Sequence, residues 1–186
     1  MNPGPYALTR RRASILVLAA AFCCARGPLL AQERESALSD AEIEKLRDTA
    51  AYPPQRVLAF VTFLDDRALE ITKLVAGKRQ PGREEDVHDR MVQFTSVAED
   101  LEDNLDDYAR RHQDVRAVLK KLIAATERWA TAVKTPAEHE AYGVARTLAL
   151  EAIADVHESA VKLTEEQRAY FLAHPPSKED QAPSRR

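Results

Sequence analysis

The chain has 186 residues, of which 27 are Lys or Arg, 30 are Asp or Glu and only five are Gly. This length suits one domain with a full hydrophobic core. Few glycines and abundant Ala, Leu, Glu and Arg favour an all-α protein, and no segment has the period-two apolar pattern of a half-buried β-strand.

Residues 1–31 have the layout of a secretory signal peptide. A basic lead, MNPGPYALTRRR, precedes the apolar run ASILVLAAAFCCA, which is shorter than the roughly 20 residues of a membrane span. The break in RGPLLAQ predicts cleavage after Ala31, with Ala25 as the second choice and an uncleaved anchor as the alternative. The residues after Arg12 fit a twin-arginine signal poorly, so the general export route is favoured. We therefore expect an exported protein, in the periplasm or the extracellular or outer envelope of a bacterium.

Removal of the signal changes the chemistry of the mature chain. Both cysteines, Cys23 and Cys24, leave with it, so no disulfide, Cys metal site or Cys nucleophile is expected. Four arginines also leave, and 23 basic residues then face 30 acids, a net charge of −7. An acidic chain of this kind repels nucleic acid and anionic lipid, so neither nucleic-acid binding nor stable membrane insertion is expected after processing.

The helical-bundle domain is expected over 39–173, after a flexible leader over 32–38. Ser39 and Glu42 have the spacing of a capping box, which predicts a short helix over about 40–50. The sequence YPP ends this helix, because the residue before a proline avoids the helical region.

A long helix is predicted from Pro53, since prolines are tolerated in the first turn of a helix. Its apolar residues recur at alternating spacings of three and four, which is typical of a buried helical stripe. Gly77 predicts its end, and the sequence GKRQPGR forms a turn. The stripe consists of Val57, Phe60, Leu64, Ala68, Ile71 and Val75.

The third helix is predicted from near Glu84, with acids in its first turn. Its apolar stripe continues far beyond the usual helix length of about a dozen residues, so two interpretations stay open. One is a break or sharp kink near Gln113, with Asp114 as a new N-cap, and the other is a single kinked helix over 84–134. The break is favoured. The stripe consists of Val87, Met91, Phe94, Ala98, Leu101, Leu105 and Tyr108, and then Val115, Val118 or Leu119, Leu122, Trp129 and Val133.

The sequence TPAE predicts the start of the last long helix, with Thr135 as its cap, Pro136 in its first position and Glu138 closing a capping box. Its stripe is rich in alanine, which permits close packing either inside the chain or across a homodimer. The stripe consists of Tyr142, Ala145, Ala149, Ala152, Val156, Ser159 and Leu163.

Thr164 and Gln167 form another capping box, which predicts a separate short helix ending near 173, and the Pro-rich tail over 174–186 is expected to be disordered. The elements together predict an all-α, antiparallel up-down bundle of about four long helices with a left-handed supercoil. A short helix is expected at each end.

An acidic run on the third helix is the candidate interaction face. The carboxylates fall opposite the apolar stripe by helical geometry, and acid-first pairs spaced four apart join Asp106 to Arg110 and Asp107 to Arg111. A solvated face laced with ion pairs is the plain interpretation. A weak divalent-cation site and a docking face for a basic partner are the alternatives. The face consists of Glu99, Asp100, Asp103, Asp106 and Asp107.

No catalytic, metal or cofactor residue is predicted. Glu85 and His88 form a single E-x-x-H, whereas di-iron bundles need two such motifs with further glutamates. His112 lies on the apolar line near a helix end and is interpreted as a packed or cap-bonded side chain, and Met91 as a core residue. The sequence has no nucleophile motif, phosphate loop or zinc motif, so an enzyme is not expected.

Residues 163–168, LTEEQR, match the L-T-x-x-Q motif, and residues 38–47, LSDAEIEKLR, form a looser copy. In these residues the chain resembles small periplasmic stress chaperones and metal-sensing helical proteins. The resemblance implies an exported all-helical protein that guards unfolded envelope proteins. The leading expectation is instead a non-catalytic exported bundle whose partner is another protein, or one that has an envelope structural role. The chaperone function and a metal- or cofactor-binding bundle are the alternatives.

Overall fold

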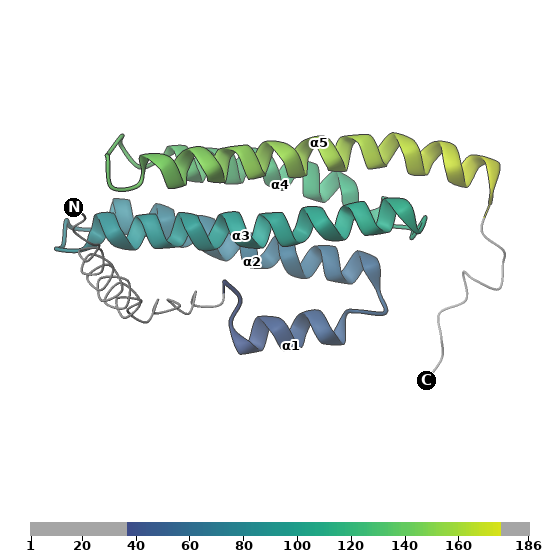
Figure 1. The fold of residues 1–186 in the computed structure, drawn as a ribbon, viewed down its shortest axis with the longest axis horizontal. Helices are drawn as coiled ribbons and strands as arrows, with labels where there is room; N and C mark the ends of the chain where they lie inside the picture. The colour runs from purple at the N-terminus through teal and green to yellow at the C-terminus, as the bar shows by residue number, and fades with distance from the viewer. Residues whose placement is uncertain (1–36, 176–186) are drawn as a thin grey trace, which may run out of the picture. The chain divides into compact units, whose positions relative to one another are not determined.

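The computed structural model describes residues 37–175, and all of their regular structure is helical (Figure 1). The expected all-α fold is therefore confirmed for this part of the chain. The signal peptide, residues 32–36 of the leader and the tail from 176 lie outside the described residues. The helices are α1 (Asp40–Asp48), α2 (Pro53–Ala76), α3 (Arg83–Arg110), α4 (Arg116–Lys134) and α5 (Gly143–Ala173).

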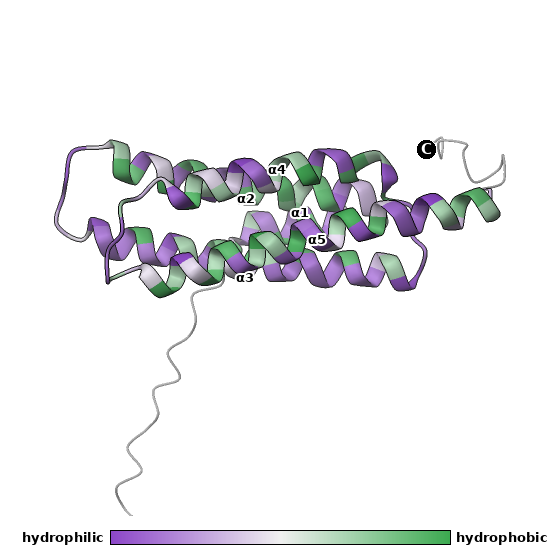
Figure 2. Cartoon of the chain, turned by 90° about the horizontal axis from the view of Figure 1, so that it is seen from above, coloured by the Kyte–Doolittle hydropathy of each residue, from purple (hydrophilic) through white to green (hydrophobic). Residues whose placement is uncertain are grey.

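The four long helices pack in a ring whose order differs from the order along the chain. Helix α2 lies against α3 and α4, and α5 lies against the same two helices (Figures 1 and 2). Helices α3 and α4 are joined by only residues 111–115, yet they face each other across the bundle. Each helix carries both apolar and polar residues along its length (Figure 2), so the apolar stripes can meet in the centre.

The bundle core is made of the predicted stripes. All stripe residues of α3 and α4 are buried, as are those of α2 except Val75, which is only partly buried. At the middle of the core, Trp129 and Phe94 are fully buried, and their rings meet edge to face with centroids 5.9 Å apart. The periodicity therefore identified the inward faces of these helices correctly.

Helix α1 begins with the predicted capping box. The Ser39 amide donates to Glu42 Oε2 at 2.8 Å, and the Glu42 amide donates to Ser39 Oγ at 3.4 Å. Both contacts satisfy amides that the first turn of a helix leaves unpaired.

The predicted break between the third and fourth helices is confirmed, but the predicted cap is displaced by one residue. His112 has a φ of 52°, a left-handed conformation that ends the helical path, and α4 begins after Val115 rather than after Asp114. Asp114 instead accepts from the Arg116 amide at 3.1 Å and from the Arg116 guanidinium at 2.7 Å. The hydrogen bond from the Arg116 side chain lowers the pKa of Asp114 below its usual value.

The predicted start of the last long helix at TPAE is wrong. Thr135 ends α4 instead, because its hydroxyl donates back to a carbonyl of that helix, and α5 begins only at Gly143. The intervening residues are held as a loop by side chains from the start of α5. The Tyr142 hydroxyl donates to the Ala137 carbonyl at 2.6 Å, and the Arg146 guanidinium donates to the same carbonyl at 2.9 Å.

The predicted short helix at the C-terminal end is also wrong, because α5 is continuous to Ala173. The Thr164 hydroxyl donates to the Ala160 carbonyl at 2.8 Å, so it bonds to the preceding turn and does not cap a new helix. The alanine-rich stripe faces the core of its own chain, where Ala145, Ala149 and Ala152 are buried. Ser159 is only partly buried, and the neighbouring Ala160 takes the inward position.

Candidate functional site

The acidic residues of α3 lie on its outer face. The stripe residues Leu101, Leu105 and Tyr108 point into the core, and the carboxylates occupy the remaining positions of the same helical turns. Of the five predicted residues, Asp107 is partly buried and the others are exposed; these are Glu99, Asp100, Asp103 and Asp106.

Ion pairing neutralises only one end of this acidic face. Asp107 Oδ1 accepts from Arg111 at 3.0 Å and from Arg110 at 3.4 Å. The predicted pair of Asp107 with Arg111 is confirmed, whereas the predicted pair of Asp106 with Arg110 is wrong because Arg110 turns to Asp107. Within residues 37–175, the four exposed carboxylates of the face have no ion-pair partner.

Two carboxylates of α3, Asp100 in the acidic face and Glu102 on the flank that faces α5, are disfavoured in their ionised form. Although the residue is exposed, neighbouring protein atoms partly desolvate the Asp100 carboxyl group and raise its pKa, and Asp103 raises it further against a smaller opposing effect of Arg56. Partial burial also raises the pKa of Glu102, helped by Asp155 of α5. In both cases the ionised carboxylate is less stable than in water, so a cationic group brought to this surface would relieve the repulsion.

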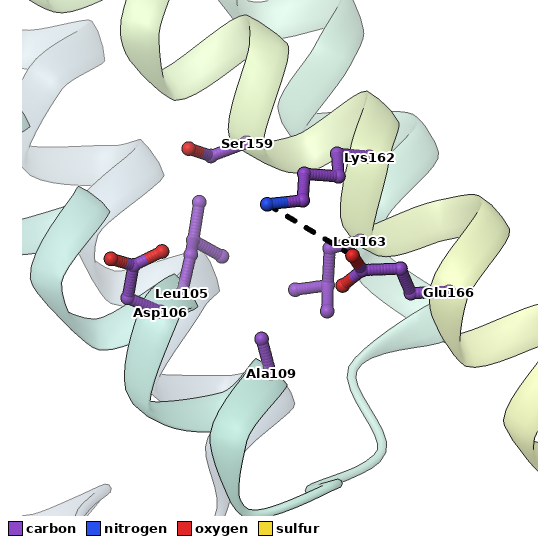
Figure 3. A pocket seen from close by; sticks show the side chains of 7 residues that line it. All are labelled: Leu105, Asp106, Ala109, Ser159, Lys162, Leu163 and Glu166. Carbon is purple, nitrogen blue, oxygen red and sulfur yellow. Dashed lines mark ion pairs between the residues drawn. The ribbon is translucent and has the colours of Figure 1, made fainter.

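A shallow hollow lies beside the acidic face, between α3 and α5 (Figure 3). It encloses about 30 Å³, roughly one water molecule, whereas sites for small molecules measure about 300–1,000 Å³. The Lys162 amine approaches Glu166 at 4.0 Å across its mouth. The hollow is therefore too small to hold an organic substrate. Its walls are Leu105, Asp106, Ala109, Ser159, Lys162, Leu163 and Glu166.

In the described part of the chain, no three His, Cys, Asp or Glu side chains converge as metal ligands. His112 stacks on the Tyr170 ring at 3.8 Å between centroids, as a packed side chain would. His157 Nδ1 lies 2.8 Å from the Thr126 hydroxyl, and His88 Nδ1 lies 3.0 Å from Asp89. Met91 is fully buried in the core.

Four buried polar side chains were not predicted; Thr49 bonds back to its own helix α1, and the other three hold elements together. Arg67 joins α2 to α1, and Thr126 joins α4 to His157 of α5. Gln167 joins α5 to the α3–α4 connection, where it accepts from the Val115 amide at 3.1 Å and donates to the Gln113 carbonyl at 2.7 Å. The glutamine of the L-T-x-x-Q motif thus links α5 to the α3–α4 connection and does not cap a helix.

A further polar contact ties α2 to α4 at the rim of the core. Asp65 receives two hydrogen bonds from the Arg128 guanidinium, at 2.8 and 2.7 Å, and one from Trp129 Nε1 at 2.7 Å. The bidentate geometry is the strong form of an Arg–carboxylate pair. This contact satisfies the polar atom of the largest core residue, so it is structural.

No protein-family model, curated protein or solved structure matches this chain. Among the described helices, none is both long and apolar enough to cross a membrane.

Proposed function

We propose that this is an exported, non-catalytic helical-bundle protein that acts by binding another protein in the bacterial envelope. The observation that carries the proposal is the face of α3, where four exposed carboxylates have no ion-pair partner within residues 37–175. The buried side chains of Arg67, Thr126 and Gln167, by contrast, make contacts between elements.

The partner surface is proposed to be basic. Desolvation, together with repulsion from neighbouring carboxylates, raises the pKa of Asp100 in the face and of Glu102 beside it, and lysines or arginines of a partner would offset the repulsion on binding. A contact of this kind weakens as salt screens the charges. The acidic charge of the whole mature chain adds long-range attraction toward a basic partner.

The scaffold of this face is proposed to be an up-down bundle in which consecutive long helices run in opposite directions. The short connections over 77–82 and 111–115 support this, since so few residues cannot return the chain to the far end of a long helix. Such a scaffold holds the α3 face rigid, which limits the entropy lost on binding.

Export is supported by the basic, apolar and small-residue segments of residues 1–31. Mass spectrometry of the protein recovered from the envelope of an expressing bacterium tests it. The expected N-terminus is Gln32, and Arg26 follows from the second cleavage choice. Recovery of the chain only in the cytoplasm with residue 1 intact would contradict export.

The binding proposal is tested by capture from an envelope extract with two variants of equal charge change. Asp103→Asn with Asp106→Asn removes two charges from the face, and Glu138→Gln with Glu140→Gln removes two exposed charges from the α4–α5 loop. We expect the natural chain and the loop variant to retain the same protein, and the face variant to lose it. Equal capture by both variants would refute the α3 face as the binding surface.

A further inference from the structure

Helix α1 lies outside the ring of four long helices and packs on α2 (Figure 1). Leu46 is the only residue within its helical span that is buried. The ring buries its own central residues, among them Val57, Phe60 and Leu64 of α2, on the inward face of that helix. The position of α1 is therefore that of a cover laid on one outer side of α2.

The surface under the cover is a second stripe on α2. Arg56, Ala59, Phe63 and Arg67 are spaced by three, four and four residues, so they share one side of the helix. Ala59 is about 200° around the helix from the core residue Val57, yet only 6% of it is exposed. Ala59 cannot be covered from the core side, and α1 packs on α2, so we infer that α1 covers Ala59 and the neighbouring Phe63.

Two arginines hold the cover at its ends. Arg67 donates to both carboxylate oxygens of Glu42, at 2.7 and 3.0 Å, and also to the Ala37 carbonyl. Arg56 donates to the Leu46 carbonyl at 2.6 Å. The Arg67–Glu42 pair is largely buried, with side-chain exposures of 8% and 18%. Burial alone would raise the pKa of Glu42, but the hydrogen bonds from Arg67 and Ser39 outweigh it and lower the pKa.

The short length of α1 makes it separable from the ring, and its contacts with α2 define what could replace it. A nine-residue helix is marginal in water by itself, so α1 depends on its attachment to α2, whereas the ring does not depend on α1 for its centre. When α1 leaves, Arg67 is exposed to water, and a helix that takes the place of α1 would bury it again; a largely buried cation without a partner is costly. A helix that takes the place of α1 must therefore supply a carboxylate as well as apolar contact with Ala59 and Phe63.

We propose that α1 is a displaceable cover over an interaction surface on α2, and that the uncovered surface binds an amphipathic helix of a partner protein that presents a carboxylate to Arg67. The inference rests on the proposed function only in that the protein acts by binding another protein. It concerns a different surface from the acidic face of α3, and the two are tested separately.

Opening of the cover is measured by the reaction of single cysteines with a thiol reagent in the full chain, with Cys23 and Cys24 replaced by serine. Ala59→Cys reports exposure of the covered stripe. Ala98→Cys reports opening of the whole bundle, because Ala98 is fully buried in the core. A faster reaction at position 59 than at position 98 identifies opening of α1 alone.

The perturbation is Glu42→Gln, with Glu44→Gln as the matched control in the same helix. Glu44 pairs with Arg47 on the exposed side of α1, so its loss leaves the attachment to α2 intact. We expect Glu42→Gln to accelerate labelling at position 59 by about tenfold or more and to leave position 98 unchanged, since the variant breaks a largely buried ion pair. Equal acceleration at both positions, or none at position 59, would overturn the proposal that α1 is a displaceable cover.

The partner chemistry is tested with a synthetic peptide that has the sequence of residues 37–50, added at millimolar concentration to the Glu42→Gln chain. This concentration matches the effective concentration of a tethered segment. We expect the peptide to slow labelling at position 59 by about threefold or more, and the same peptide with Gln in place of Glu42 to give no protection. Equal effects of the two peptides, or none, would overturn the requirement for a carboxylate helix. If the chain still captured a partner through the α3 face in that case, the proposed function would stand and only this inference would fail.

Discussion

Replacement of Gln167 by methionine tests whether one buried side chain holds the diagonal connection between α3 and α4. Gln167 is 3% exposed and makes two hydrogen bonds to the backbone of that connection, to the Val115 amide and the Gln113 carbonyl. Methionine has nearly the same length and apolar packing but neither polar group. Gln167→Met therefore removes the hydrogen bonds while it leaves the volume of the core filled.

The expected loss of stability depends on whether the two backbone groups that lose a hydrogen bond can reach water. Val115 is fully buried, so its amide has no route to water, and an unsatisfied buried donor costs about 1–3 kcal/mol. Gln113 is only partly buried, so its carbonyl regains water and the loss there is nearer the net value of a hydrogen bond, about 1 kcal/mol. The free energy of unfolding is expected to fall by about 2–4 kcal/mol.

Urea unfolding followed by circular dichroism at the helical band measures this change. With a urea dependence of about 2 kcal/mol per molar, the midpoint should fall by about 1–2 M. Gln55→Met is the matched control, because Gln55 is an exposed helical residue and the propensities of the two side chains are similar. A loss at position 167 no larger than that of the control, which should stay within about 0.5 kcal/mol, would refute this role of Gln167.

Three further predictions test the core, the rim and the acidic face. Asp65→Ala should lower the free energy of unfolding by about 2 kcal/mol, because Trp129 Nε1 loses a charged acceptor. The fluorescence emission of Trp129, the only tryptophan in the sequence, should change as well, and unchanged emission would contradict the contact. Leu101→Ala should lower the free energy of unfolding, measured with a chemical denaturant, by about 2–5 kcal/mol, because Leu101 is fully buried. Leu69→Ala, at a half-exposed position, should lower it by less than about 1 kcal/mol, and similar losses in the two variants would show that the burial assignment is wrong. Glu102→Gln should stabilise the fold at pH 7 and have no such effect at pH 3.5, where both the folded and unfolded carboxyl groups are protonated; a loss of stability at pH 7 would contradict the raised pKa.

The inward faces of the helices could be predicted from sequence because they depend on a repeated pattern. A stripe such as Val87, Met91, Phe94 and Ala98 places four apolar groups on one side of any helix, whatever its neighbours are. Burial of such a stripe is the largest favourable contribution to folding, so tertiary contacts do not override it. The break at His112 was also predictable, because basic residues at a helix end and a following acid are local signals.

The errors arose where a local signal competed with a contact distant in sequence. Thr135 has the letters of a helix cap, but side chains of Tyr142 and Arg146 take the carbonyls of the following segment and hold it as a loop. Thr164 and Gln167 have the spacing of a capping box, but Gln167 satisfies the Val115 amide from 52 residues away in the sequence. The ring order was equally inaccessible, because periodicity identifies which face is buried and not which helix covers it.

The acidic face differs from these structural contacts because it opposes the stability of the fold. The pKa of Asp100 in the face and that of Glu102 beside it are raised in the folded chain, so these groups bind protons more tightly in the folded state than in the unfolded state. The ionised groups therefore disfavour folding at neutral pH, and stability recovers as the pH falls through the raised pKa values. The arginines nearest in sequence, Arg110 and Arg111, pair with Asp107 at one end and leave the rest of the face uncompensated. Lysines or arginines of the basic partner proposed above would attract the ionised carboxylates, and binding would therefore offset part of this cost.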